Sequence, residues 1–197
     1  LQFGLHKTDV GWTFREWAPN ATRIFLVGDF SGWKEREEFA LNRDKNGEWS
    51  INLPKDSLRH GQKYKLRVYW PGGDGWRLPS YANYVIQDEN SVDFSAVVWS
   101  PKTPYNWQNN TPPKPKVPLI YEAHVGMSSQ KEKVASFSEF TTEVLPRIKE
   151  SGYNTVQLMA IAEHPYYGSF GYHVSNFFAV SSRFGTPDDF KKLVDTA

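Results

Sequence analysis

A cluster of aromatic side chains between positions 160 and 186 is the part of this sequence whose residue types most suggest binding chemistry. It follows a β-prone run, Thr155–Met159, and precedes a helix start signal at Thr186. The connection is about 25 residues long, whereas such connections usually run about 2–6 residues, and long ones are usually functional. Aromatic faces stack on flat ligands such as sugar rings. The aromatic residues are Tyr166, Tyr167, Phe170, Tyr172, Phe177, Phe178 and Phe184.

Two pairs of ionisable residues are the other candidates for chemistry. Glu163 and His164 are adjacent in the aromatic connection and could act as metal ligands or as an acid–base pair, but we favour loop-stabilising hydrogen bonds. Glu122 and His124 alternate with Tyr121 and Ala123 along a predicted strand, where neighbours usually satisfy buried polar groups. A structural role is favoured for His124, although its place near the strand end leaves a role in a cleft open. We predict no metal site and no cofactor.

The elements around these residues follow a strand–helix–strand–loop–helix order. The predicted strands are Leu119–Val125 and Thr155–Met159, with apolar residues at helical spacing between them and Gly152 as a stop signal. Pro146 within that helix predicts a kink or a late start. Thr186 is a predicted N-cap, followed by a proline and two acidic residues in the first turn. This order is the beginning of a parallel α/β fold, and the chain ends inside a helix, so we expect a fragment.

The first hundred residues have a different pattern. Short apolar runs are separated by turn residues such as Asn46–Gly47, and Tyr64, Leu66, Val68 and Trp70 alternate with basic residues. Several strands spaced about every 10 residues predict an antiparallel β-sandwich. The prolines between 101 and 118 predict a semi-rigid, extended linker. We therefore predict three parts: a β-sandwich at 1–100, a linker at 101–118 and the start of a larger α/β domain at 119–197.

The composition restricts the classes of partner. The formal net charge of the 197 residues is +1, which argues against a nucleic acid as the main partner. No run of 18 apolar residues is present, so we predict no membrane span. The absence of cysteine excludes disulfides and thiolate sites and fits a reducing compartment, and we predict a cytoplasmic location. Eight tryptophans indicate a sandwich core, platforms for carbohydrate, or both.

Several motifs together resemble the 1,4-α-glucan branching enzymes, most closely their eukaryotic-type branch that acts on glycogen and starch. The resemblance covers nearly all of 118–197. The N-terminal motifs resemble the immunoglobulin-like carbohydrate-binding module of branching enzymes and isoamylases, which the AMP-activated kinase β subunit shares. The motifs are Phe14–Ala21, Val27–Trp33, Tyr121–Ser129, Val144–Lys149, Gly152–Asn154, Gln157–Ile161, Tyr166–Val174 and Phe177–Pro187.

The resemblance implies a fold and a reaction. Residues 119–197 would be the first βαβα portion of a (β/α)8 TIM barrel of the α-amylase superfamily. The enzyme would cut an α-1,4 bond, hold the glucan on an Asp and pass it to a 6-hydroxyl, with retention of configuration. The family's nucleophile and acid follow later barrel strands, so the resemblance places them beyond Ala197. This segment would hold no catalytic carboxylate.

The resemblance also implies site residues. In the family, the tyrosine that matches Tyr172 stacks on the sugar at the cleavage subsite, and His173 and Tyr166 are secondary candidates for the same cleft. In the module, Trp33, Lys65 and Trp76 match a glycan site in which two coplanar indoles would cover consecutive glucose rings. Asp93 departs from that pattern, which has Asn there. The alternative for Trp33, Lys65 and Trp76 is packing within the core or between domains.

Two other functions remain as alternatives. One is a non-catalytic module that targets a partner to glycogen, and the other is a debranching enzyme of the isoamylase type. The barrel motifs argue against the first, and the motifs at Tyr121–Met127 and Gln157–Ile161 favour branching over debranching. The expected partner is an α-glucan polysaccharide, namely glycogen, amylose or amylopectin, with no nucleic acid and no membrane.

Overall fold

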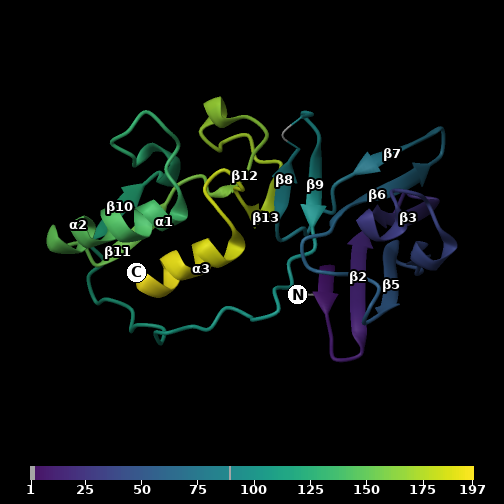
Figure 1. Cartoon of the computed structure of the whole chain (residues 1–197), viewed down its shortest axis with the longest axis horizontal. Helices are drawn as coiled ribbons and strands as arrows, with labels where there is room; N and C mark the ends of the chain where they lie inside the picture. The colour runs from purple at the N-terminus through teal and green to yellow at the C-terminus, as the bar shows by residue number, and fades with distance from the viewer. Residues whose placement is uncertain (1–2, 89) are drawn as a thin grey trace. The chain divides into compact units, whose positions relative to one another are not determined.

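The computed structural model describes residues 3–88 and 90–197, which form two compact units (Figure 1). The first unit runs to Lys102 and includes Asn176–Ala179. The second comprises Thr103–Ser175 and Val180–Ala197. The three-part division at 1–100, 101–118 and 119–197 stays a prediction. No helix in the described residues is long and apolar enough to cross a membrane.

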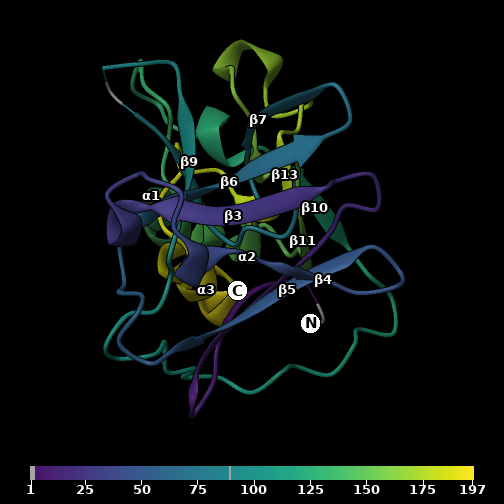
Figure 2. The same cartoon turned by 90° about the vertical axis from the view of Figure 1, so that its right-hand side faces the viewer.

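The first unit is built from two antiparallel sheets, which confirms the predicted β-sandwich (Figure 2). One sheet has the order β1-β2-β5-β4, with strands Gly4–Lys7, Gly11–Trp17, Glu48–Pro54 and Asn42–Arg43. The other has the order β3-β6-β9-β8, with strands Arg23–Gly28, Lys63–Trp70, Phe94–Val97 and Val85–Gln87. Strand β7, Gly73–Arg77, pairs with β6. Two 3-10 turns, η1 at Asp29–Ser31 and η2 at Glu37–Phe39, follow β3.

The period-2 pattern of the sequence explains the core of this unit. Trp12 and Phe14 of β2 are buried on either side of the less buried Thr13. Tyr64 and Leu66 of β6 are buried as the alternation predicts, but Lys65 between them is buried as well. Truncating a fully buried phenylalanine such as Phe14 to alanine typically costs about 3–5 kcal/mol, so a few such residues account for much of the stability of a small domain.

The second unit contains one parallel strand pair with a helical segment between the strands. Strands β10 (Ile120–Ala123) and β11 (Thr155–Leu158) pair in parallel, with Ile120 opposite Thr155. Its core includes Val125, Phe137, Phe140, Leu145, Ile148, Phe184 and Leu193. The connecting elements are η3 at Val125–Met127, α1 at Phe137–Glu139, η4 at Phe140–Val144 and α2 at Leu145–Glu150.

Pro146 is accommodated by a change in helix type. The residues before it form a π-helical turn, η4, and α2 starts afresh with the proline in its first turn. Proline has no N–H to donate to a carbonyl four residues earlier, so a regular α-helix across this position would lose a hydrogen bond and clash. The helix therefore has both a distortion and a second start at the place where the sequence predicted a conflict.

The last helix begins as the sequence predicted. Helix α3 spans Pro187–Thr196. The Thr186 hydroxyl accepts from the Asp189 N–H, and the Asp189 carboxylate accepts in return from the Thr186 N–H. The connection before it is more structured than expected. It contains β12 (Ala162–Glu163), η5 (Tyr167–Ser169) and β13 (Asn176–Val180), because Phe177, Phe178 and Val180 are strong strand formers.

The proline-rich segment is held to α3 by one carboxylate. Asp195 accepts hydrogen bonds from the Tyr105 hydroxyl at 2.8 Å and from the backbone N–H groups of Gln108 and Asn109, each at 2.9 Å. These bonds, the Gln108 N–H foremost, lower the pKa of Asp195 below its ordinary value of 3.8. Residues 105–109 are therefore tied to the end of α3 by a charged acceptor.

Replacing this carboxylate tests the tie. Asp195→Asn should lower the melting temperature at pH 7, because the amide is a weaker acceptor for three donors. A carboxylate with a depressed folded-state pKa stabilises the fold above its unfolded-state pKa, and this contribution is lost as the pH falls through the folded-state value. The difference between wild type and variant should therefore shrink as the pH falls below the ordinary value of 3.8 and through the lowered folded-state pKa. Glu150→Gln, at an exposed carboxylate of α2, is the control, and an equal loss in both variants would contradict the prediction.

Candidate functional site

Trp33 is presented at the surface of the first unit by a left-handed turn. Gly32 and Trp33 have φ of 62° and 59° at the end of η1. The indole N–H of Trp33 donates to Asp29 Oδ1 at 2.9 Å, and Asp29 Oδ2 accepts from the Lys63 N–H at 2.7 Å. Trp33 is 39% exposed. Asp29 thus links the Trp33 indole to β6, while the indole stays partly exposed.

Trp76 lies beside Trp33, but the two rings do not form a flat platform. Their centroids are 6.4 Å apart and their planes meet at 62°. The expectation of two coplanar indoles is therefore wrong. Arg67 of β6 is opposite Trp76 of β7, and its guanidinium lies 5.4 Å from the Trp76 ring centre, so one face of that indole already has a cationic neighbour. The indoles form a corner.

Lys65 is brought close to Trp33 in the same region. Its side chain is only 9% exposed, and its Nζ lies 2.6 Å from Asp93 Oδ2. A second ion pair joins Lys63 Nζ to Asp88 Oδ2 at 3.4 Å. These residues line an open pocket of about 340 Å³ whose walls offer an indole, ammonium donors and carboxylate acceptors. The lining residues are Asp29, Trp33, Lys63, Lys65, Asp88, Ser91, Asp93 and Ser95.

The second unit carries Tyr166, Tyr172 and His173 on one surface loop. Tyr172 is 65% exposed and Tyr166 is 67% exposed, and His173 is exposed as well. The Tyr172 N–H donates to Ser169 O, which closes the turn before it. Gly168 lies under the Tyr166 ring, because a Cβ there would be 2.3 Å from ring atoms. The loop therefore supports two exposed phenol rings.

Glu163 and His164 are buried and stabilise the loop, as favoured from the sequence. The Glu163 carboxylate accepts from the N–H groups of His164 and Ser182 at 2.9 and 2.7 Å, and it pairs with Arg183 at 3.4 Å. His164 Nδ1 lies 3.0 Å from Ala162 O. Nowhere in residues 3–88 and 90–197 do three His, Cys, Asp or Glu side chains gather as a metal site would require.

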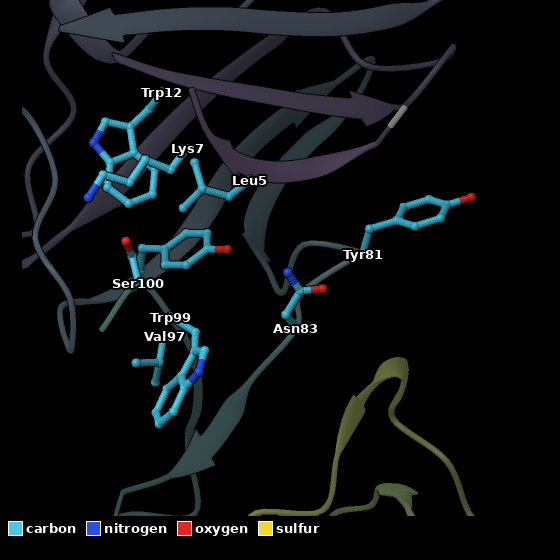
Figure 3. Close-up of a pocket in the computed structure, with 9 residues that line it drawn as sticks. Leu5, Lys7, Trp12, Tyr81, Asn83, Val97, Trp99 and Ser100 are labelled. Atoms are coloured by element: carbon cyan, nitrogen blue, oxygen red, sulfur yellow. The ribbon is translucent and has the colours of Figure 1, made fainter. Parts of the chain in front are cut away.

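A pocket lined by residues of both sheets, around Trp12 and Trp99, is too small for a sugar ring. Figure 3 shows residues of β1 and β2, including Lys7 and Trp12, facing Val97, the last residue of β9, and Trp99 after it. Its volume is about 60 Å³, which leaves room for a few water molecules only. It is a gap in the packing of the first unit, and the open pocket beside Trp33 is the better candidate for a glycan.

Three contacts that shape these sites were not predicted from the sequence. Asp29 lies four residues before Trp33 and orients it, while Asp88 pairs with Lys63. His124 contacts the loop of Tyr172 through Phe170 O. Only the contact of Asp29 could have been predicted from neighbouring residues, because an acidic side chain a few positions before a tryptophan in a turn can accept the indole N–H. The other two contacts join residues far apart in the chain.

Comparison with known proteins identifies relatives over the whole chain. Residues 2–82 match the family described as "Carbohydrate-binding module 48 (Isoamylase N-terminal domain)". A 1,4-alpha-glucan-branching enzyme of Yarrowia lipolytica is 47% identical, over 100% of this chain and 30% of the relative. Those of Dictyostelium discoideum and Solanum tuberosum are 44% and 46% identical, over 99% and 100% of this chain and 30% and 24% of the relatives.

Solved structures share the fold at lower sequence identity. A pullulanase from Bacillus acidopullulyticus is 21% identical with a TM-score of 0.77, over 99% of this chain and 28% of that chain. A mutant pullulanase from Paenibacillus barengoltzii complexed with maltotetraose is 20% identical, also with a TM-score of 0.77, over 100% of this chain and 36% of that chain. These similarities concern the fold alone.

The similarity to the branching enzymes is of a different degree. It reaches 42–47% identity and extends over at least 99% of the chain. The chain spans about 30% of the length of the first of these relatives. Over that stretch, the chain is similar to the 1,4-alpha-glucan-branching enzymes, and its residues 2–82 match the carbohydrate-binding module family.

Proposed function

We propose that this chain is the part of a 1,4-α-glucan branching enzyme that holds its carbohydrate-binding module and the beginning of its catalytic domain. The observation that carries the proposal is the identity of 42–47% to curated branching enzymes over at least 99% of the chain. The enzyme would cleave an α-1,4 glucan chain and transfer it to a 6-hydroxyl. The glucan would be held covalently on an aspartate between the two steps, so the configuration is retained.

The second unit would be the first βαβα portion of a (β/α)8 barrel. The parallel pairing of β10 with β11, the helical segment between them and helix α3 after them support this assignment. In such barrels the substrate lies at the C-terminal ends of the strands. Tyr172 and His124 follow the C-terminal ends of β11 and β10, respectively, so both are on segments that would border the substrate.

Tyr172 would stack on the glucose at the bond being cleaved. Its exposed ring and the closed turn beneath it support this role, because a ring held ready loses little freedom on binding. Tyr166 and His173 would line the same cleft. No cofactor is needed for the reaction, which uses carboxylate chemistry.

The module would hold an α-glucan at the open pocket beside Trp33. Trp33 and Trp76 would contact glucose rings from two sides of a corner, while Lys65 and its neighbours would bond hydroxyl groups. Glycogen, amylose and amylopectin are the proposed ligands. The cytoplasmic location stays a prediction, because relatives include enzymes named chloroplastic/amyloplastic.

The test is the product formed by an enzyme of the relatives' full length. Incubated with amylose, it should reduce the iodine colour while the content of α-1,6 linkages rises. Loss of α-1,6 linkages from amylopectin would instead identify a debranching enzyme. This alternative is suggested by the match of residues 2–82 to a family named after the N-terminal domain of isoamylase. Glycan binding without any change in linkages would identify a targeting module.

A binding experiment tests the module separately. Trp33→Ala should weaken binding of a soluble malto-oligosaccharide by about tenfold, or roughly 1.4 kcal/mol, because one stacking face is lost. Isothermal titration would measure the affinity. Trp17→Ala, at an exposed tryptophan of β2 on the other sheet, is the matched control. Equal affinities for wild type and Trp33→Ala would assign Trp33 to packing.

A further inference from the structure

His124 is held between two backbone groups that come from different parts of the second unit. Its Nδ1 lies 3.3 Å from the Met127 nitrogen, whose N–H it accepts at the start of η3. Its Nε2 lies 2.9 Å from Phe170 O. A carbonyl oxygen can only accept, so Nε2 must carry the hydrogen. The imidazole therefore uses both of its nitrogens, in one tautomer, to join the end of β10 to the loop after β11.

The backbone at Phe170 needs such support. Phe170 has a φ of 53°, a left-handed conformation that is unfavourable for a bulky residue, and Gly171 follows with a φ of 83°. Gly171 also passes so close to Ala160 that a Cβ would lie 2.4 Å from the Ala160 oxygen. Tyr172 is the next residue. The position of its ring thus depends on two consecutive left-handed residues.

The ring of His124 has little freedom to swing away. It lies edge-on between Phe170, at 6.3 Å, and Phe184, at 5.7 Å. The turn that follows it is equally confined, because a Cβ at Gly126 would lie 2.6 Å from Phe184 and 3.1 Å from Tyr167. The His124–Met127 turn is therefore closely packed against η5 and the residues after it.

We infer that His124 is a positioning residue for Tyr172: its Nε2–H holds the carbonyl of Phe170 and thereby fixes the left-handed pair from which Tyr172 projects. The inference rests on the proposed function, because that function provides the glucan that Tyr172 would contact. His124 acts through Tyr172 and need not touch the glucan itself.

Two amide substitutions separate the two contacts of the ring. In His124→Asn the side-chain oxygen replaces Nδ1, so the cap on Met127 is kept and the bond to Phe170 is lost. In His124→Gln the amide nitrogen reaches the position of Nε2, so the bond to Phe170 is kept and the cap is lost. In the full-length enzyme acting on amylose, His124→Asn should lower kcat about fivefold or more with KM changed less than about twofold, whereas His124→Gln should keep most of kcat.

Two further measurements decide between positioning and general stability. In a Tyr172→Ala background, His124→Asn should have no additional effect on kcat. Amide hydrogen exchange should be faster at Phe170 and Tyr172 in His124→Asn, by about tenfold, and faster at Met127 only in His124→Gln. His6→Asn is the control, since His6 Nε2 makes a comparable 2.8 Å contact with Phe3 O in the first unit.

Equal losses of kcat in the Asn and Gln variants, or an undiminished effect of His124→Asn without Tyr172, would overturn the inference. Unchanged exchange at Phe170 and Tyr172 would do the same. If Tyr172→Ala itself left kcat intact, the proposed subsite would be wrong, and the exchange pattern would still decide whether His124 holds the loop.

Discussion

The 197-residue chain alone is expected to convert no amylose, whereas an enzyme of the relatives' full length should convert it readily. Retaining transfer needs a carboxylate nucleophile and a carboxylic acid about 5–5.5 Å apart. Of the glutamates near the strand ends of the second unit, Glu122 accepts from the Gln157 amide at 2.9 Å, and Glu163 is fully buried and bonded to Ser182. Glu163 is therefore inaccessible to a substrate, and the Glu122 carboxylate is engaged by an amide.

The measurement follows iodine colour and α-1,6 linkages over time. Losing both members of such a pair removes the covalent step, so the expected ratio of the two rates is several orders of magnitude. The control is the same chain with Tyr172→Ala. Turnover by the 197-residue chain that disappears in this control would show that the chemistry resides within these residues and would refute the prediction.

In the full-length enzyme, Tyr172→Ala should lower kcat by about tenfold or more, which is at least roughly 1.4 kcal/mol of transition-state stabilisation. The ring would contact the sugar at the bond being broken, which flattens towards an oxocarbenium ion. Binding of a long glucan is spread over many other contacts, so its affinity should change little.

Steady-state kinetics on amylose give kcat and KM separately. Tyr153→Ala provides a comparison, because Tyr153 is also an exposed tyrosine of the second unit but precedes β11 rather than following it. A raised KM with unchanged kcat in Tyr172→Ala would make Tyr172 a general binding residue and refute the subsite assignment.

Local signals predicted much of the fold. The N-cap at Thr186, the stop at Gly152 and the conflict at Pro146 each depend on residues a few positions apart, and each is found where the sequence placed it. The alternation along β6 likewise predicted that Tyr64 and Leu66 belong to the core of the first unit, although Val68 and Trp70 of the same face are only partly buried. Short-range rules succeed here because capping, turn formation and strand periodicity are determined by neighbours in the chain.

The geometry of the sites could not be predicted in the same way. The angle between Trp33 and Trp76 depends on strand pairing and on Arg67 across the strands, and the tie between His124 and Phe170 spans 46 positions. The sequence resemblance indicated which aromatic residues are candidates. The orientation of each ring, however, depends on contacts that only the folded chain brings together.

The tie at Asp195 has a consequence for the order in which the protein acquires its structure during synthesis. Tyr105, Gln108 and Asn109 precede their acceptor by 90, 87 and 86 positions. At translation rates of about 5–20 residues per second, this delay is roughly 4–18 s. During that interval the proline-rich segment has been synthesised, but Asp195, the acceptor of its hydrogen bonds, has not. A chaperone or protease in the cell would meet residues 105–109 in that window more readily than at any later time.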